Sequence, residues 1–196
     1  MFLPFFGRKP RLTEAQRGRL QALEGSDSAE LAAELLRGPT ALLQLTLPEA
    51  RQVVSYMLPM RIPEGNTFIR QGDRQSTDFM VLVLEGEVTV DTIVVSRTQP
   101  MVVNVLGKGS LIGEMGLLDG EPRAASCTAS SPLTCAILTR RALEELLIDD
   151  PQTTAKLMLA VSIRIAQRMR DTSDKLKRYA QLTQTMQHEI NRLLPS

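Results

Sequence analysis

The chain has 196 residues, of which 43% are hydrophobic and 23% charged, and its formal net charge is +1. This length suits one domain with additional segments, and no apolar run reaches the eighteen or so residues of a membrane span. The N-terminus, MFLPFFGRKPR, places aromatic residues before basic ones, the reverse of a secretory signal. We therefore expect a cytoplasmic protein. Its aromatic N-terminus can dock on a partner protein, fold back on its own domain or touch a membrane surface, and so short a segment favours the protein contact.

Short helices are predicted first along the chain, in an N-terminal extension over residues 1–39. Residues 12–25 and 26–38 each open on a Thr or Ser/Asp cap signal and close on a glycine. A third helix is predicted over residues 46–58, with Thr46 as its N-cap and Pro48 in its first turn.

The hydrophobic pattern changes to that of strands at Arg61. Short β-branched runs alternate with Gly, Pro, Asn or Asp over residues 61–73, 79–96, 100–113 and 125–139. This pattern is typical of an antiparallel sandwich or roll, which we assign to residues 40–150. Cys127 and Cys135 flank a turn-like stretch, and we expect reduced core thiols because the chain carries no export signal.

Helical periodicity returns over residues 140–150 and continues after Pro151 to the end, so that residues 151–196 form one long C-terminal helix. Residues recur every seven positions in two series, Ile165, Thr172, Tyr179, Met186, Leu193 and Met169, Leu176, Thr183, Ile190. A helix of this length extends roughly 60 Å, more than one small domain can cover, so the heptads predict a coiled-coil homodimer. Its basic residues have the spacing of a solvated helix face, and no nucleic-acid binding is expected.

One stretch carries chemistry, GSLIGEMGLLDGEPRAAS over residues 109–126. A strand, a loop and a short helical turn free backbone N–H groups there, and with Arg123 these groups suit the oxygens of a phosphate. Glu114 would repel a phosphate, but its carboxylate can accept a hydrogen bond from a neighbouring sugar hydroxyl. A phosphate, a hydroxyl and an apolar shelf together describe a nucleotide.

The same stretch resembles the phosphate-binding cassette of the cyclic nucleotide-binding domains, of the form G-E-x-[AG]-L-x-x-x-x-P-R-[AST]-A. The matching residues are Gly113, Glu114, Met115, Gly116, Leu117, Pro122, Arg123, Ala124 and Ala125. The preceding glycine turns are also similar, and the resemblance runs from about residue 40 to about residue 180. It implies an α+β fold, a double-stranded β-helix (jelly roll) with N-terminal helices and a long C-terminal helix.

The resemblance also implies roles for residues. Arg123 would bind the equatorial phosphate oxygens, Glu114 the ribose 2′-hydroxyl, and the rest of the cassette would supply backbone contacts: Gly113, Met115, Gly116, Ala124 and Ala125. The family's apolar base pocket falls at Ile69, Val90, Val103 and Leu106. The alternatives are that Arg123 forms a structural salt bridge and that Glu114 caps the short helix.

The catabolite activator branch of this family carries T-S-[DE]-K in its long helix, and this chain has TSDK from Thr172 to Lys175. The resemblance implies that Thr172, and Ser173 from the other subunit, reach the adenine amine. The stretch from Pro151 to Thr172 is about four residues longer than in that branch, nearly one helical turn. If the helix docks in the same way, Arg168 contacts the base instead, and both alternatives stay open because the two residues share one face.

The implied function is a sensor that binds cAMP, has no catalytic activity, metal or other cofactor, and signals to an effector protein. Ala124 favours cAMP because family members that prefer cGMP tend to carry threonine there. Only 24 residues follow Thr172, too few for a helix-turn-helix domain. The single histidine, His188, lies in the terminal helix, which argues against a metal-dependent cupin enzyme. The alternatives are a structural dimer that has lost the ligand and a receptor for cGMP or a cyclic dinucleotide.

Overall fold

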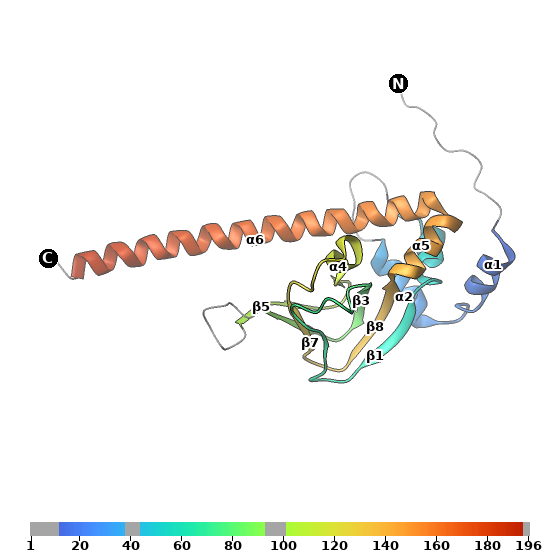
Figure 1. Ribbon diagram of the computed structural model, residues 1–196, viewed down its shortest axis with the longest axis horizontal. Helices are drawn as coiled ribbons and strands as arrows, with labels where there is room; N and C mark the ends of the chain where they lie inside the picture. Colours follow the sequence, from blue (N-terminus) through green and yellow to red (C-terminus); the bar gives the residue numbers. More distant parts are fainter. Residues whose placement is uncertain (1–11, 38–43, 93–100, 194–196) are drawn as a thin grey trace, which may run out of the picture.

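The protein is built around an antiparallel β-sandwich (Figure 1). The structure is a computed structural model that describes residues 12–37, 44–92 and 101–193. At residues 101–103 and 191 it describes the backbone alone. One sheet has the strand order β1 (Leu58–Ile62), β8 (Leu133–Thr139), β3 (Phe79–Glu85) and β6 (Leu111–Ile112). The other has the order β2 (Thr67–Ile69), β7 (Ser126–Ala129), β4 (Val88–Thr92) and β5 (Met101–Leu106). The jelly-roll fold predicted from the sequence is confirmed. The N-terminal MFLPFFGRKPR stretch lies outside the described residues.

Strand β3 shows how the sandwich and the helices share one sheet. Its residues from Met80 to Leu84 are all 2% exposed or less, because the strand is covered on both faces. Val81 and Val83 pack in the core between the two sheets, whereas the alternate residues pack in a second core with the helices. The free thiols of Cys127 and Cys135 lie in the core between the sheets, as predicted.

The N-terminal helices begin at the predicted caps. They are α1 (Glu14–Gln21), α2 (Asp27–Leu36) and α3 (Leu47–Val54), whose N-caps are Thr13, Ser26 and Thr46. Helix α3 ends four residues before the predicted end, because Leu58 already belongs to β1 and lies opposite Ile137 of β8. The prediction of helix as far as residue 58 was therefore wrong, since strand pairing overrides the local helical pattern there.

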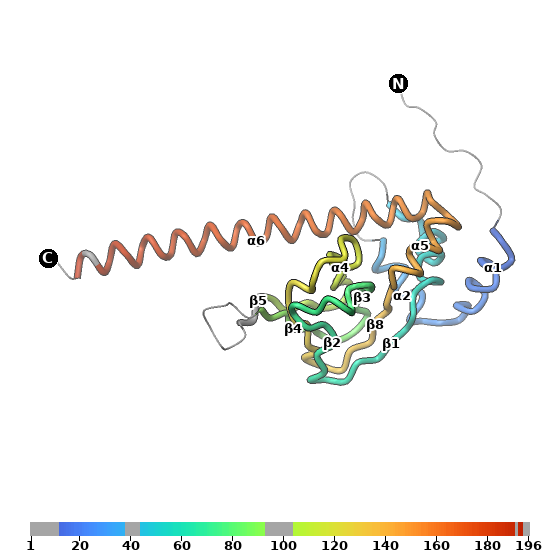
Figure 2. The backbone as a smooth tube through the Cα atoms, viewed as in Figure 1, coloured from blue at the N-terminus to red at the C-terminus, as the bar shows by residue number. Residues whose placement is uncertain are grey.

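The long helix predicted for the C-terminal segment is confirmed as α6 (Pro151–Leu193), which follows α5 (Arg140–Asp149). Its first half is fastened to the helical layer, where the Lys156 ammonium lies 2.9 Å from both carboxylate oxygens of Glu49 in α3. Figures 1 and 2 show that α6 then passes α4 (Glu114–Asp119) and continues well beyond the sandwich. Within the described residues no helix is long and apolar enough to cross a membrane.

Candidate functional site

A cavity of about 410 Å³ lies where α6 passes the phosphate-cassette stretch. Its walls come from three parts of the chain: the second sheet, residues 112–116 and 121–125 around α4, and the face of α6 from Arg168 to Tyr179. The sequence-predicted residues Glu114 and Arg123 both line it, together with nearly all of the predicted cassette. The site is thus a crevice between the sandwich and one helix, as ligand sites often are.

The Arg123 side chain is buried and is held by three hydrogen bonds and one aromatic ring. It is 4% exposed, and its guanidinium lies 4.5 Å above the centre of the Phe79 ring. The Nε donates to the carbonyl of Ser76 at 2.9 Å, Nη1 to that of Gly113 at 2.8 Å, and Nη2 to that of Phe79 at 2.9 Å. These bonds use three of the five N–H groups of a guanidinium, so two remain for a ligand. Burial lowers the pKa of Arg123.

Two glycines of the cassette make room for this guanidinium. A Cβ atom at Gly113 would lie 2.7 Å from Nη1 of Arg123, and one at Gly116 would lie 3.1 Å from the same atom. Gly113 also has a φ of +80°, which side chains rarely adopt. The resemblance gives both glycines backbone contacts to the ligand, and the structure adds that Gly113 in particular leaves the space that the arginine occupies.

A turn before β3 presents one of the carbonyls that Arg123 uses. The Oδ1 of Asp73 accepts the backbone N–H groups of Gln75, at 2.8 Å, and of Ser76, at 3.3 Å. These two hydrogen bonds lower the pKa of Asp73. The backbone N–H of Arg123 donates to the Asp73 carbonyl at 2.9 Å, so the turn positions both ends of the arginine.

Glu114 is buried and paired with the long helix. Its side chain is 4% exposed, and its Oε1 accepts a hydrogen bond of 2.8 Å from Nη1 of Arg168. The Nη2 of Arg168 donates to the carbonyl of Leu111, also at 2.8 Å. The N-cap of α4 is Gly113, so Glu114 does not cap that helix through its side chain. The structure therefore brings Arg168 to the carboxylate predicted to bind the sugar.

The face of α6 settles where the residues of the TSDK stretch lie. Thr172 lines the cavity one turn after Arg168, and its hydroxyl donates to the Arg168 carbonyl at 2.8 Å. Ser173 is exposed and is not among the described residues that line the cavity. Lys175, Leu176 and Tyr179 do line it, and the sequence analysis had placed the last two only in the heptad series.

Apolar side chains of the sheet form the floor of the cavity. Ile69, Val90 and Leu106 line it as predicted, whereas the side chain of Val103 lies outside the described residues. Cys127 of β7 also lines it, and burial raises the pKa of its thiol to about 12. A neutral thiol at this position adds to the apolar floor.

Sequence reasoning missed several lining residues, of which Asn104, Asp119 and Glu121 carry polar groups. Asp119 and Glu121 lie inside the cassette pattern at positions the pattern leaves open, so their acidity could have been noted there. Asn104 stands beside Val103 and Leu106 in a strand already assigned to the base pocket. Among the described residues, no group of three His, Cys, Asp or Glu side chains could hold a metal ion.

Comparisons with known proteins agree on the kind of domain that this chain forms. A family model described as the cyclic nucleotide-binding domain matches residues 59–150. A crystal structure of a cyclic nucleotide-binding domain from Methylobacillus flagellatus KT is similar over 77% of this chain and 83% of that chain, with 30% identity and a TM-score of 0.72. The Thermus thermophilus catabolite activator protein is similar over 74% of this chain and 63% of that chain, with 25% identity and a TM-score of 0.60.

A curated relative is the CRP-like cAMP-activated global transcriptional regulator of Mycobacterium tuberculosis, 23% identical over 118 residues that make up 60% of this chain. The matched region is 50% of that regulator, so this chain spans about half of its relative's length. The family is regulatory rather than catalytic. From its fold, its cassette and these similarities, the chain belongs to the cyclic nucleotide-binding domain family.

Proposed function

We propose that this protein is a cAMP sensor that reports the nucleotide to a partner protein through α6. The observation that carries the proposal is the burial of one arginine and one carboxylate, Arg123 and Glu114, on the walls of a 410 Å³ cavity with an apolar floor. A buried guanidinium and a buried carboxylate that do not pair with each other suit a ligand that has both an anionic and a hydroxyl group.

The phosphate is assigned to Arg123. Its three bonds to backbone carbonyls hold the guanidinium in place, and the remaining N–H groups of Nη1 and Nη2 can bind two phosphate oxygens. Because the arginine is already ordered, little side-chain entropy is lost when the ligand binds. Ala124 and Ala125, which also line the cavity, are small enough to let the phosphate approach the backbone.

The sugar is assigned to Glu114. Its Oε1 already accepts a hydrogen bond from Arg168, and the carboxylate offers its other oxygen to a ribose hydroxyl. The ligand and α6 thus share one carboxylate. This sharing gives the nucleotide a direct influence on the position of the long helix, which is what a sensor requires.

The base is assigned to the space between the apolar floor and Thr172. Because the Thr172 hydroxyl donates to the Arg168 carbonyl, it offers only its lone pairs to a ligand. The N6 amine of adenine is a donor and matches these lone pairs, whereas guanine has an acceptor oxygen at the same place. Ala124 lacks the hydroxyl that could bind the guanine amine, so both positions favour cAMP.

The output of the sensor is assigned to the exposed part of α6. Six apolar residues of the heptad series form an exposed stripe along α6, and each is between 48% and 71% exposed: Met169, Leu176, Tyr179, Met186, Ile190 and Leu193. Exposure of so many large apolar side chains to water is unfavourable and is typical of an interaction surface. We therefore include a homodimer through this stripe in the proposal. Leu176 and Tyr179 belong to both the stripe and the cavity wall, so the dimer interface would continue into the nucleotide site. The N-terminal extension, the roll and α6 would act as three parts, with bounds near residues 39 and 150.

Calorimetric titration with cAMP, cGMP and a cyclic dinucleotide tests the function. We expect one cAMP per chain and an affinity for cAMP about 5- to 100-fold higher than for cGMP, since one or two polar groups decide between them. Thr172→Val should reduce this preference, and Ala124→Thr should improve cGMP binding.

Thr185→Val is the matched control for Thr172→Val, because Thr185 makes the same bond to a preceding carbonyl, at 3.0 Å, at a position outside both the heptad series and the cavity lining. If the wild-type chain binds none of the three nucleotides, the sensor proposal is wrong and a structural dimer becomes the better interpretation. Tight binding of the cyclic dinucleotide alone would instead overturn the choice of cAMP.

A further inference from the structure

Two carboxylates lie at the rim of the cavity beside Arg123. They belong to Asp119 and Glu121, which both line the cavity and are both exposed. Gly120, with a φ of +73°, ends α4 and turns the chain back along it. A Cβ atom at Gly116 would lie 3.1 Å from Nη1 of Arg123 and 3.5 Å from the carbonyl oxygen of Glu121. The Glu121 backbone and the guanidinium are therefore close neighbours.

The Asp119 side chain is held at the same turn. Its Oδ1 accepts the backbone N–H of Glu121 at 2.9 Å, so the carboxylate of Asp119 lies against the first residue after the turn. This bond uses one lone pair of one oxygen and leaves the negative charge in place. Two negative charges thus border the space next to the remaining N–H groups of Arg123.

Three further carboxylates act on the same arginine. Burial lowers the pKa of the Arg123 guanidinium, and the charges of Asp73, Asp78 and Glu114 act in the opposite direction. An opposite charge has this effect only from a short distance. The arginine is therefore set among carboxylates both inside the protein and at the rim of the cavity.

The other basic side chains in the cavity wall offset these carboxylates only in part. Arg168 is already paired with Glu114 at 2.8 Å. Lys175 is exposed and follows Arg168 by two turns of α6, about 10 Å along the helix. At the proposed phosphate position Arg123 is thus the main positive charge, and it suits a ligand with one negative charge.

The number of charges distinguishes a cyclic nucleotide from a linear one. A cyclic phosphate is a diester and carries one negative charge, whereas the monoester left after hydrolysis of one ester bond carries nearly two at about pH 8, because its second pKa is about 6. Coulomb energy falls inversely with distance, so two carboxylates cancel one arginine that lies at half their distance. The second charge of a linear nucleotide would therefore meet net repulsion.

We propose that Asp119 and Glu121 form a charge filter that accepts the singly charged cyclic phosphate and rejects doubly charged linear nucleotides such as 5′-AMP. The proposal rests on the proposed function. Because both side chains are exposed, they act through their electrostatic field, and solvent screens the effect of each one. The filter would keep the sensor from responding to the hydrolysis product of its own ligand.

The methyl ester of 5′-AMP separates charge from shape, because it is linear but carries a single negative charge on its phosphate. Competition against cAMP, followed by calorimetry on the full chain at about pH 8, measures the affinities of the ester and of 5′-AMP. We expect the wild type to bind the ester roughly 3- to 10-fold more tightly than 5′-AMP. The difference should shrink at about 0.5 M salt, where charges are strongly screened.

Neutral variants test the two carboxylates directly. Asp119→Asn keeps an oxygen that can accept the Glu121 N–H, and Glu121→Gln keeps the size of the side chain. Each ligand should gain affinity in proportion to its charge, so a roughly 2-fold gain for the ester should accompany a roughly 4-fold gain for 5′-AMP. Glu64→Gln is the matched control, because Glu64 is exposed and is not among the described residues that line the cavity.

The outcomes separate the filter from the sensor. Equal affinities of the wild type for the ester and for 5′-AMP would overturn the filter and leave the sensor intact. Equal gains of the two linear nucleotides in Glu121→Gln would also overturn it, because the residue would then act through shape rather than charge. Absence of cAMP binding by the wild type would overturn both proposals.

Discussion

Arg123→Ala should destabilise the protein even when no nucleotide is added. The substitution leaves the carbonyls of Ser76, Gly113 and Phe79 without their present donor inside the fold. Each hydrogen bond to a charged group contributes about 1.5–3 kcal/mol to the free energy of unfolding. The alanine variant loses these contributions, but part of the loss is offset because a charge no longer has to be desolvated on folding. We therefore expect a loss of about 3 kcal/mol in the free energy of unfolding.

Thermal unfolding followed by circular dichroism measures this loss. For a chain of this size, about 3 kcal/mol corresponds to a decrease of roughly 6–12 °C in Tm. Arg123→Lys should fall between the alanine variant and the wild type, because an ammonium keeps the charge but cannot reach three divergent carbonyls. Arg70→Ala, at an exposed position of the same domain, is the control and should change Tm by less than about 2 °C. A Tm for Arg123→Ala within about 2 °C of the wild type would refute the reasoning and reduce Arg123 to a ligand contact.

Three other predictions concern the cavity and the stripe. Gly113→Ala should lower the free energy of unfolding by about 2–4 kcal/mol in urea titrations, because it places a Cβ 2.7 Å from a buried guanidinium at a residue with a φ of +80°. The control Gly107→Ala should lower it far less, because a Cβ there meets open space. Cys127 should react slowly with N-ethylmaleimide at pH 8, because burial raises the pKa of its thiol to about 12, and bound cAMP should slow the reaction further. A reaction of Cys127 in the folded protein as fast as in the urea-unfolded chain, measured by peptide mapping, would contradict this. Met186→Glu should give a monomer in light scattering and Gln184→Glu should not, and a dimer in both would exclude the stripe as the interface.

Much of the local structure could be predicted because it depends on residues that are close together in the sequence. Capping residues lie within one turn of the backbone N–H groups that they bind, so Thr13, Ser26 and Thr46 identify the starts of three helices. The seven-residue period of the C-terminal segment likewise predicts one long helix. The glycine and arginine spacing of the cassette points to a phosphate site without any knowledge of the packing.

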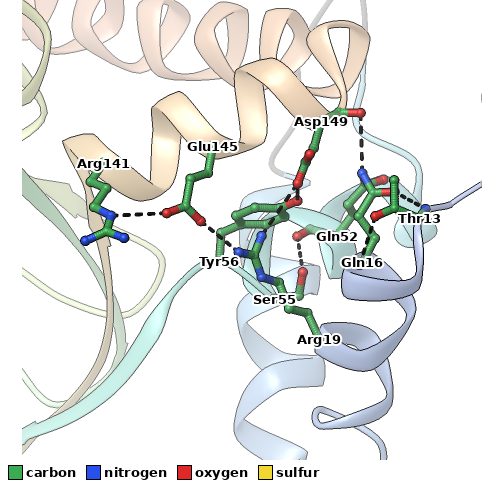
Figure 3. Close-up of polar contacts among 9 residues, drawn as sticks. All are labelled: Thr13, Gln16, Arg19, Gln52, Ser55, Tyr56, Arg141, Glu145 and Asp149. Carbon is green, nitrogen blue, oxygen red and sulfur yellow. Dashed lines mark hydrogen bonds and ion pairs between the residues drawn. The ribbon is translucent and has the colours of Figure 1, made fainter.

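The partners of the site residues could not be predicted, because they depend on how distant segments come together. Arg123 binds carbonyls of residues 76 and 79, and the sequence gives no signal for a backbone acceptor. Helix α3 ends early because β1 pairs with β8, a strand that comes far later in the chain. Helix α1 is attached to the last turns of α5 through Gln16 and Arg19 (Figure 3), and no sequence pattern indicates these contacts in a helix with so few apolar residues.

The position of α6 against the sandwich is the clearest case. The sequence by itself determined that Arg168 and Thr172 share one helix face, and it left open which of them meets the ligand. Only the tertiary structure decided that Arg168 pairs with Glu114, while Thr172 faces the cavity one turn later. The physical reason is that helical periodicity fixes rotation about the helix axis but not translation along it. That translation is set by distant contacts, such as those of Lys156 with Glu49 and of Arg164 with Leu35.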